Sequence, residues 1–332
     1  MKALSFLLPE STDAPRNLAT EQFVFDALPR DRSYLLLWQN RSAVIVGKHQ
    51  DTLAEINRPF VEERGIQVVR RLSGGGAVYH DLGNLNYTII TDAGSTETLN
   101  MSLFCQPVLR LLRSLGVPAE LTGRNDITME GRKFSGSAQY LRRGRILHHG
   151  TLLFDSDLSV VEQALRVDPD KIRSKGLASV RSRVTNLRPW LPEGLDLPRF
   201  RELLLEEILR ESPGEPWVPD GEQNAQIEAL CRSRYRSWDW NVGASPPCSL
   251  IRKGRFEGCG TVEARMQIEH GRIAALVFQG DFFSAEEPEE LAGLLLGLPP
   301  EREPLGAALA GRDVSRWLMG MKNEQLLELL ST

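Results

Sequence analysis

The chain has 332 residues, a length that predicts one large domain and one smaller domain. Of these residues 41% are hydrophobic and 25% charged, a composition typical of a soluble globular protein. Its net charge of −4 argues against an overall nucleic-acid binder, and no apolar run approaches the roughly 18 residues that a membrane-spanning helix needs. The four cysteines have no C-x-x-C spacing, so neither a zinc site nor a disulfide framework is expected.

The N-terminal segment MKALSFLLPE has an apolar run too short for a signal peptide, and no small-residue cleavage site follows it. Together with the unpaired cysteines this predicts a cytoplasmic protein. Short apolar runs rich in β-branched and aromatic residues then predict strands at residues 33–38, 42–47, 66–72 and 77–90.

A helix is predicted over residues 98–116, because apolar residues recur there at three- and four-residue spacing from Leu103 to Leu115. Gly116 supplies a C-terminal stop. Pro107 is expected to lie in the first turn of this helix or to kink it, since proline lacks the backbone donor that a helix interior uses.

A second long helix is predicted over residues 197–211, with Phe200, Leu203, Leu204 and Ile208 facing the core. Two proline-rich stretches, residues 211–222 and 241–250, are expected to be connectors, and the second is the better domain boundary.

The segment after this boundary predicts a small domain. Residues 260–280 form strand-like runs around the hairpin turn EHGR, and helices are expected near 284–296 and 313–330. The predicted division is therefore a large domain over residues 1–245 and a small accessory domain over 246–332.

Strands and helices alternate irregularly along the chain instead of following strict βα units. This favours an α+β fold, with a mixed or antiparallel sheet in the large domain and a smaller α+β domain at the C-terminus.

The stretch RRLSGGGAVYHDLGN, residues 70–84, is the most informative segment. It has neither the G-x-x-x-x-G-K-[ST] spacing of a P-loop nor the G-x-G-x-x-G turn of a Rossmann fold, and a strand pattern follows Gly76. Three glycines between strands form either a hairpin turn or a nest of backbone N–H groups that binds an anion. Since neighbouring strand residues point to opposite faces, we expect Arg71 to reach the site and Arg70 to be a structural or surface partner.

Charge is unevenly distributed along the chain. Residues 124–183 contain 12 Lys and Arg against 7 Asp and Glu, a surplus of +5, which leaves −9 for the remainder. This middle segment is where an anionic ligand such as a nucleotide is expected.

Four separated motifs, in this order, resemble those of the lipoate–protein ligase A family within the larger biotin/lipoate ligase group. They are RRLSGGGAVYHDLGNLN (70–86), GRNDITMEGRKFSGSAQY (123–140), HHGTLLFD (148–155) and KGLASVRSRVTNL (175–187). The segments at 17–28 and 43–50 are similar to the family too, so the resemblance covers essentially the whole chain. The part beyond residue 243 resembles the accessory domain more loosely.

The resemblance implies an enzyme that activates the carboxylate of lipoic acid with ATP and Mg²⁺, holds lipoyl-AMP and passes the acyl group to a lysine amine. Because activation brings two anions together, the site needs a cation that serves both. Lys133 is the candidate catalytic residue, bridging the acyl carbonyl and the α-phosphate, since an ammonium is a compact point charge.

The residues that the resemblance assigns to ATP or adenylate binding are Arg71, Gly75, Gly76, Ala77, Val78, Tyr79, Asn84, Asn125, Asp126, Lys133 and Arg181. Those assigned to lipoate binding are Ser73, Gly74, Lys133, His149 and Thr151. For the apolar tail, the candidates are Val44, Val78 and Tyr79.

Several roles stay open at this stage. Asp126 either contacts Mg²⁺, which would be shared with phosphate oxygens and water, or caps a turn. One of His148 and His149 contacts the acyl group or the adenylate, or else both make their hydrogen bonds within the protein core. The same two roles are open for His80. The fourth motif adds a basic loop with Lys175, Arg181 and Arg183, which the resemblance expects to close over the adenylate and exclude water.

Three alternatives are weighed against a ligase. An ATP-independent octanoyl or lipoyl transferase uses a cysteine nucleophile, but none of the four cysteines lies in the site motifs. A biotin ligase has a G-R-G-R-x-G-R loop, which is absent here. A non-catalytic lipoyl-binding protein is expected to lose the central lysine or the loop arginine, and both are present.

The resemblance also implies partners. Apo lipoyl domains of 2-oxoacid dehydrogenase E2 subunits or the glycine-cleavage H protein would accept the lipoyl group. No nucleic acid or membrane partner is expected, and a monomer is the default.

Overall fold

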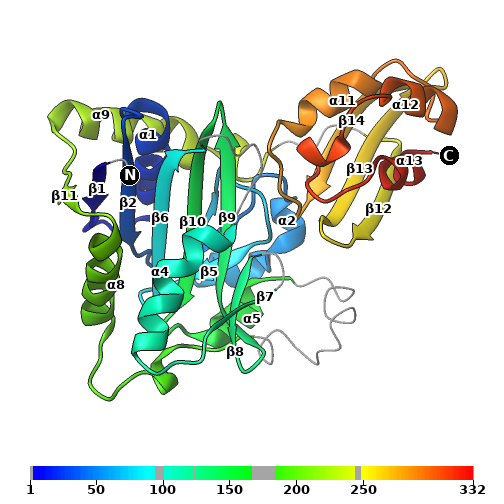
Figure 1. The fold of residues 1–332 in the computed structure, drawn as a ribbon. Coiled ribbons are helices and arrows are strands. Elements are labelled where there is room, and N and C mark those ends of the chain that lie inside the picture. The colour runs from blue at the N-terminus through cyan, green and yellow to red at the C-terminus, as the bar shows by residue number, and fades with distance from the viewer. Residues whose placement is uncertain (1–2, 94–100, 123–124, 167–183, 244–247, 332) are drawn as a thin grey trace.

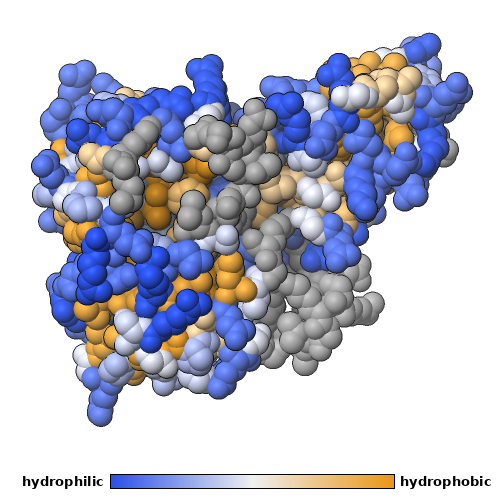
Figure 2. All heavy atoms as spheres, in the orientation of Figure 1, coloured by the Kyte–Doolittle hydropathy of each residue, from blue (hydrophilic) through white to orange (hydrophobic). Residues whose placement is uncertain are grey.

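The computed structural model describes residues 3–93, 101–122, 125–166, 184–243 and 248–331. A large body built around one sheet and a smaller C-terminal body lie side by side (Figure 1). On the face shown in Figure 2, charged and polar residues cover most of both bodies, and patches of apolar residues lie among these polar residues. None of the four cysteines forms a disulfide bond.

The large body contains an eight-stranded mixed sheet in the order β11-β1-β2-β6-β10-β9-β8-β7. Strand β1 is parallel to both of its neighbours, and the remaining pairs are antiparallel, so the predicted α+β class with a mixed sheet is confirmed. The strands are β1 Ala3–Leu7, β2 Arg32–Trp38, β6 Asn84–Asp92, β7 Glu120–Thr122, β8 Asp126–Met129, β9 Arg132–Arg142, β10 Arg145–Leu153 and β11 Gly214–Pro216.

Part of the proline-rich stretch at 211–222, expected to be a connector, is thus the edge strand β11, which pairs with β1 through Leu4 and Gly214.

A second, three-stranded sheet carries the glycine loop, the segment around Gly74, Gly75 and Gly76. It consists of β3 Ala43–Val46, β4 Gln67–Arg70 and β5 Val78–His80, in the order β4-β3-β5. The single strand predicted over residues 77–90 is therefore wrong, because the chain turns between β5 and β6. At this turn the Gly83 N–H donates to Asp81 Oδ1 at 2.9 Å, and a Cβ on Gly83 would lie 2.0 Å from the Asp155 carbonyl oxygen.

Helices cover both faces of the large sheet, and β2 shows why. Its Leu35 and Leu37 pack in the cluster beneath α4 Met101–Ser114 and α8 Leu197–Glu211, while Leu36 and Trp38 pack beneath α1 Ala14–Ala27. The other helices of this body are α2 Thr52–Glu55, α3 Arg58–Glu63, α5 Leu158–Ala164, α9 Gly221–Leu230 and α10 Trp238–Asn241, with a 3₁₀ turn at Arg188–Trp190 and a π turn at Cys231–Tyr235.

Both predicted long helices are present. Helix α4 ends just before Gly116, whose φ of +79° is the left-handed conformation expected of a C-terminal glycine. Pro107 lies inside this helix and not in its first turn. Helix α8 starts where the Asp196 side chain accepts a hydrogen bond from the Arg199 N–H.

The C-terminal body is a three-stranded antiparallel sheet of β12 Leu250–Phe256, β13 Gly260–Glu269 and β14 Arg272–Gly280. The hairpin predicted at EHGR is confirmed, with φ of +50° at His270 and +72° at Gly271. Three helices pack on the sheet: α11 Pro288–Leu295, α12 Arg302–Ala308 and α13 Asn323–Leu330.

The helix predicted over 313–330 is wrong in its first half. Only a 3₁₀ turn at Val314–Arg316 precedes α13, because the chain reverses at Gly320, whose φ is +82°. Helix α12 was not predicted. The predicted domain boundary after residue 245 lies outside the described residues.

Three buried histidines make the stability of this fold depend on pH. Burial lowers the pKa of His49, His80 and His148 from an ordinary 6.5 to about 3, so each is neutral in the folded protein at neutral pH. Below about pH 6.5 the unfolded chain binds a proton at each position and the native state does not. Their contribution to stability is therefore complete above that pH and is lost as the pH falls toward 3.

We expect each of the three to lower the free energy of unfolding by roughly 1–2 kcal/mol between pH 7 and pH 5. Urea titrations at pH 7, 6 and 5 should show the midpoint falling with pH, and His148→Gln should make that fall shallower. A midpoint that does not change with pH in this range would contradict the assignment.

Candidate active site

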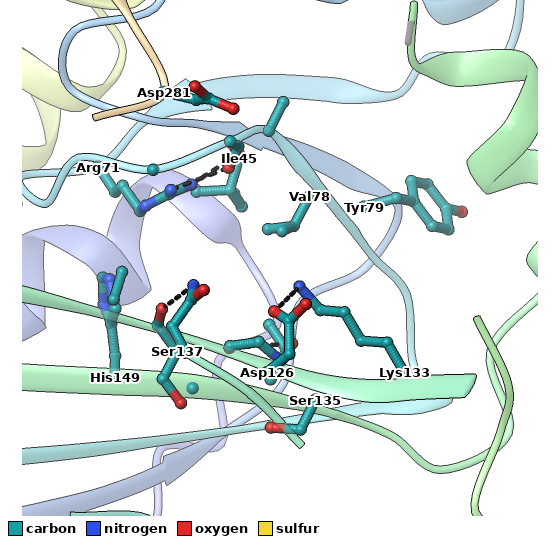
Figure 3. Close-up of a pocket in the computed structure, with 18 of the residues that line it drawn as sticks. Ile45, Arg71, Val78, Tyr79, Asp126, Lys133, Ser135, Ser137, His149 and Asp281 are labelled. Carbon is teal, nitrogen blue, oxygen red and sulfur yellow. Dashed lines mark hydrogen bonds and ion pairs between the residues drawn. The ribbon is translucent and has the colours of Figure 1, made fainter. Parts of the chain in front are cut away.

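A cavity of about 870 Å³ lies where the glycine loop, the large sheet and the C-terminal body meet. Its volume is in the range of pockets that hold cofactors and drug-sized ligands. Figure 3 shows side chains from three sources facing this space: Arg71 and Val78 from the glycine-loop sheet, Asp126, Lys133 and His149 from the large sheet, and Asp281 from the C-terminal body.

Lys133 and Asp126 form an ion pair in the wall of the cavity, with 2.6 Å between Nζ and Oδ1 (Figure 3). The register of β8 against β9 shifts between Ile127 and Thr128, so that Thr128 lies opposite Lys133 while Asp126 lies opposite Gly136. Such a bulge re-aims side chains at the edge of a site. It brings the ammonium over Gly136, where a Cβ would lie only 2.6 Å from Nζ.

Arg71 lies in the cavity wall, but its guanidinium is already occupied by the protein. It donates to Ser73 Oγ at 3.0 Å and to the carbonyl oxygens of Ile45, Gly74 and Gly76 at 3.1, 2.7 and 2.9 Å. Burial lowers its pKa to about 10, so it stays charged at neutral pH. Arg71 therefore holds the glycine loop in shape.

Arg70 is buried, so of its two predicted roles the surface one is wrong. Its Nη1 donates to the carbonyl oxygens of Gly47, Lys48 and Gln50 at 2.7–2.9 Å. The two adjacent arginines contact different partners, and both stabilise loops through backbone carbonyls.

A series of buried hydrogen bonds connects the glycine loop to the large sheet and to α1. Ser73 Oγ lies 2.7 Å from His149 Nε2, and His149 Nδ1 lies 2.9 Å from Glu21 Oε1. Glu21 is 1% exposed and also accepts a hydrogen bond from Thr88 Oγ1 at 2.7 Å. This carboxylate offsets the buried charge of Arg71, and nothing in the sequence pattern had singled it out.

The structure brings most predicted site residues together. The following line the cavity: Arg71, Gly75, Gly76, Ala77, Val78, Tyr79, Asn125, Asp126, Lys133, His149 and Thr151. His80, whose role the sequence leaves open, lines it too.

Other predicted residues lie elsewhere. Ser73 and Gly74 do not line the cavity, because Ser73 turns toward His149 and a Cβ on Gly74 would lie 2.2 Å from the Phe282 carbonyl oxygen. Asn84 is also absent from the lining, since its side chain donates to Asn86 Oδ1 at 2.9 Å. His148 lies in the core, 3.0 Å from Gln139 Nε2.

The predicted tail pocket needs a correction. Val44 is absent from the lining and packs with the Tyr79 ring in a separate cluster, so neighbouring Ile45 takes its place. Figure 3 shows Val78 pointing into the cavity and the Tyr79 ring pointing away. The basic-loop candidates Lys175, Arg181 and Arg183 lie outside the described residues.

The C-terminal body forms part of the cavity wall, which the sequence pattern did not indicate. Arg255, Phe256, Asp281 and Phe283 line it. The Gly75 N–H donates to the Phe282 carbonyl oxygen at 3.2 Å, so one amide of the expected nest is used within the protein. Ion pairs join the two bodies beside this contact, between Lys48 and Glu287 and between Asp51 and Arg265.

Two family models match the chain. One, described as the lipoyl protein ligase A/B catalytic domain, matches residues 13–209, and the other, described as the bacterial lipoate protein ligase C-terminus, matches residues 245–330. Lipoate–protein ligase 1 of Staphylococcus aureus is 40% identical over 320 residues, 96% of this chain and 97% of the relative. Lipoate-protein ligase LplJ of Bacillus subtilis is 40% identical over 329 residues, 98% of this chain and 99% of the relative.

Solved structures share the fold. P. falciparum LipL1, crystallised in complex with lipoate, has a TM-score of 0.79 at 24% identity and covers 94% of this chain and 95% of its own. A lipoate-protein ligase A bound with ATP has a TM-score of 0.60 at 24% identity, covering 73% of this chain and 99% of its own.

Proposed function

The chain belongs to the lipoate–protein ligase family, and we propose how its cavity performs the reaction of that family. The enzyme activates lipoate with ATP to lipoyl-AMP and transfers the lipoyl group to a lysine of a lipoyl domain. In the first step a carboxylate oxygen attacks the α-phosphorus and pyrophosphate leaves. In the second, the lysine amine attacks the acyl carbon and AMP leaves.

The observation that carries this proposal is the position of Lys133, over Gly136 and paired with Asp126 in the cavity wall. Asp126 holds the ammonium in place, and the ammonium then lowers the repulsion between the acyl carboxylate and the α-phosphate. A charge fixed before the reaction stabilises the transition state without reorganising. Gly76, where a Cβ would meet nothing within 4 Å, leaves room for a phosphate close to the backbone.

The cavity suits a magnesium ion that is held mainly by phosphate oxygens and water. Asp126 is the carboxylate that would supply a protein oxygen, and the described residues contain no group of three His, Cys, Asp or Glu that could cage a metal. When bound, such an ion neutralises phosphate charge.

The apolar part of the wall is suited to the acyl tail. Leu18, Trp38, Ile45 and Val78 line it. We propose that the tail lies among these side chains, with its carboxylate toward Lys133.

A transferase that uses a cysteine is disfavoured, because no cysteine occurs among the described residues that line the cavity. The acceptors we propose are lipoyl domains of E2 subunits or the H protein. A monomer in the cytoplasm is part of the same proposal. In the described part of the chain, no helix combines the length and apolar character that crossing a bilayer requires.

The test is pyrophosphate release from Mg·ATP with lipoate and no acceptor protein. We expect release to depend on lipoate and to become catalytic when an apo lipoyl domain is added, because the adenylate is then consumed. A transferase or a binding protein would release no pyrophosphate under either condition, and that result would overturn the proposal.

A further inference from the structure

Two buried N–H groups in the cavity wall have no partner among the described residues, and both belong to residues that neighbour Trp38. They belong to His80 and Asn86, which are 3% and 2% exposed. The His80 ring meets the Trp38 ring edge-on, with 6.2 Å between centroids, and Asn86 is the residue opposite Trp38 in the β2–β6 pair.

Hydrogen bonds on the far side of His80 determine which of its nitrogens carries the proton. The Asn17 amide nitrogen donates to the Ser11 and Gln39 carbonyl oxygens and, at 3.0 Å, to Asn40 Oδ1. Asn40 therefore presents its Nδ2 donor to His80 Nδ1 at 3.0 Å. Since burial keeps this histidine neutral, Nδ1 accepts and Nε2 carries the hydrogen. No group in the described part of the chain accepts from Nε2.

Asn86 presents a second donor. Its Oδ1 accepts from Asn84 Nδ2 at 2.9 Å, which leaves Nδ2 without a partner. The alternation along β6 places Asn86 on the cavity side, because Leu85 and Tyr87 pack in the core beneath α4. A buried donor without an acceptor is destabilising, so such a group in a native structure requires an explanation, and a bound ligand that accepts the hydrogen bond is one.

The strand pairing places Asn86 two strands away from the residue under the Lys133 ammonium. The ammonium lies over Gly136, whose N–H is 3.3 Å from Thr151 Oγ1, and Thr151 pairs with Asn86 on the next strand. Two strand spacings separate Gly136 from Asn86, a distance of about 10 Å. This matches the length of an extended medium-chain acid with its carboxylate at Lys133.

We propose that His80 and Asn86 recognise the dithiolane ring of lipoate and select it over a plain hydrocarbon tail, an inference that rests on the proposed function. A ring sulfur accepts weak hydrogen bonds and makes favourable contacts with an aromatic ring, here that of Trp38. The methyl end of octanoate does neither, so it leaves both donors without partners.

With an apo lipoyl domain present so that the enzyme turns over, the experiment compares pyrophosphate release with lipoate and with octanoate in the wild type, Asn86→Leu and His80→Phe. We expect the wild type to favour lipoate, and each variant to lower the ratio of the two kcat/KM values about three- to tenfold. The loss should come from lipoate, with octanoate unchanged or improved. Gln139→Leu is the matched control, since it removes an amide from the same sheet outside the cavity lining and should leave the ratio unchanged.

A ratio that stays at the wild-type value in both variants, with thermal melting showing that they are folded, would overturn the inference. That result is also expected if a water molecule satisfies both donors without touching the tail. The proposed function fails in a different way, through a wild-type protein that releases no pyrophosphate with either acid.

Discussion

Replacing Lys133 with alanine should lower kcat/KM for lipoate-dependent pyrophosphate release by at least about 10³-fold. The substitution removes the ammonium and leaves the Asp126 carboxylate in the cavity wall, where it adds a third negative charge to the two reacting anions. Since the ion pair is partly exposed, with 24% and 16% of the side chains accessible, its loss should change the free energy of unfolding by no more than about 1 kcal/mol. Initial rates at saturating Mg·ATP, with urea titrations alongside, would measure both effects.

Two further variants separate charge from the other properties of this side chain. Removing Asp126 as well, in Lys133→Ala/Asp126→Ala, should recover part of the lost rate if repulsion by the uncompensated carboxylate contributes to the defect. Lys322→Ala, in the C-terminal body, removes a lysine far from the cavity lining and should keep the wild-type rate. A Lys133→Ala protein that keeps its activity would remove this residue from the mechanism.

Residues inside the sequence motifs were largely predictable, because a motif fixes both the residue type and its neighbours. The glycine loop and the segment around Lys133 form the cavity wall as expected. Within a motif, however, which residue reaches the cavity depends on where each strand begins. The break between β5 and β6 could not be located from the continuous apolar pattern, so Asn84 was chosen where Asn86 lines the cavity.

Side-chain partners were less predictable than positions. Arg71 was correctly placed beside the glycine loop, but a guanidinium satisfied by carbonyl oxygens of the loop itself cannot be distinguished in sequence from one that awaits a phosphate. Similarly, Glu21 lies on a helix far along the chain from His149, and the contact between them depends on how α1 packs on the sheet.

The contribution of the C-terminal body could not be predicted at all, because it arises where residues far apart in the sequence meet. Phe283 has an unremarkable sequence context, yet its ring would lie 2.9 Å from a Cβ on Gly75. The glycines of the loop therefore have two physical reasons to be glycine: room for a ligand at Gly76, and close approach of the second body at Gly74 and Gly75.

Gly136→Ala should lower kcat/KM about 10²-fold while leaving the fold intact. The new Cβ would lie 2.6 Å from Lys133 Nζ and 2.8 Å from Cε, so the ammonium has to move. A shift of about 1 Å in a positioned group can reduce a rate by this factor. The cost in stability should be small, because Gly136 lacks a positive φ and the atoms it would meet belong to the end of a flexible side chain. Pyrophosphate-release rates and melting temperatures of the variant provide the measurement.

The double variant Lys133→Ala/Gly136→Ala gives the more decisive result. If the methyl group acts only by displacing the ammonium, it has nothing to displace once the lysine is gone, and the double variant should be no slower than Lys133→Ala alone. Gly293→Ala is the control, since a Cβ there meets nothing within 4 Å. Additive losses would show that Gly136 contributes through space for the substrate. A wild-type rate in Gly136→Ala would show that the ammonium does not need the position over Gly136 in which the structure holds it.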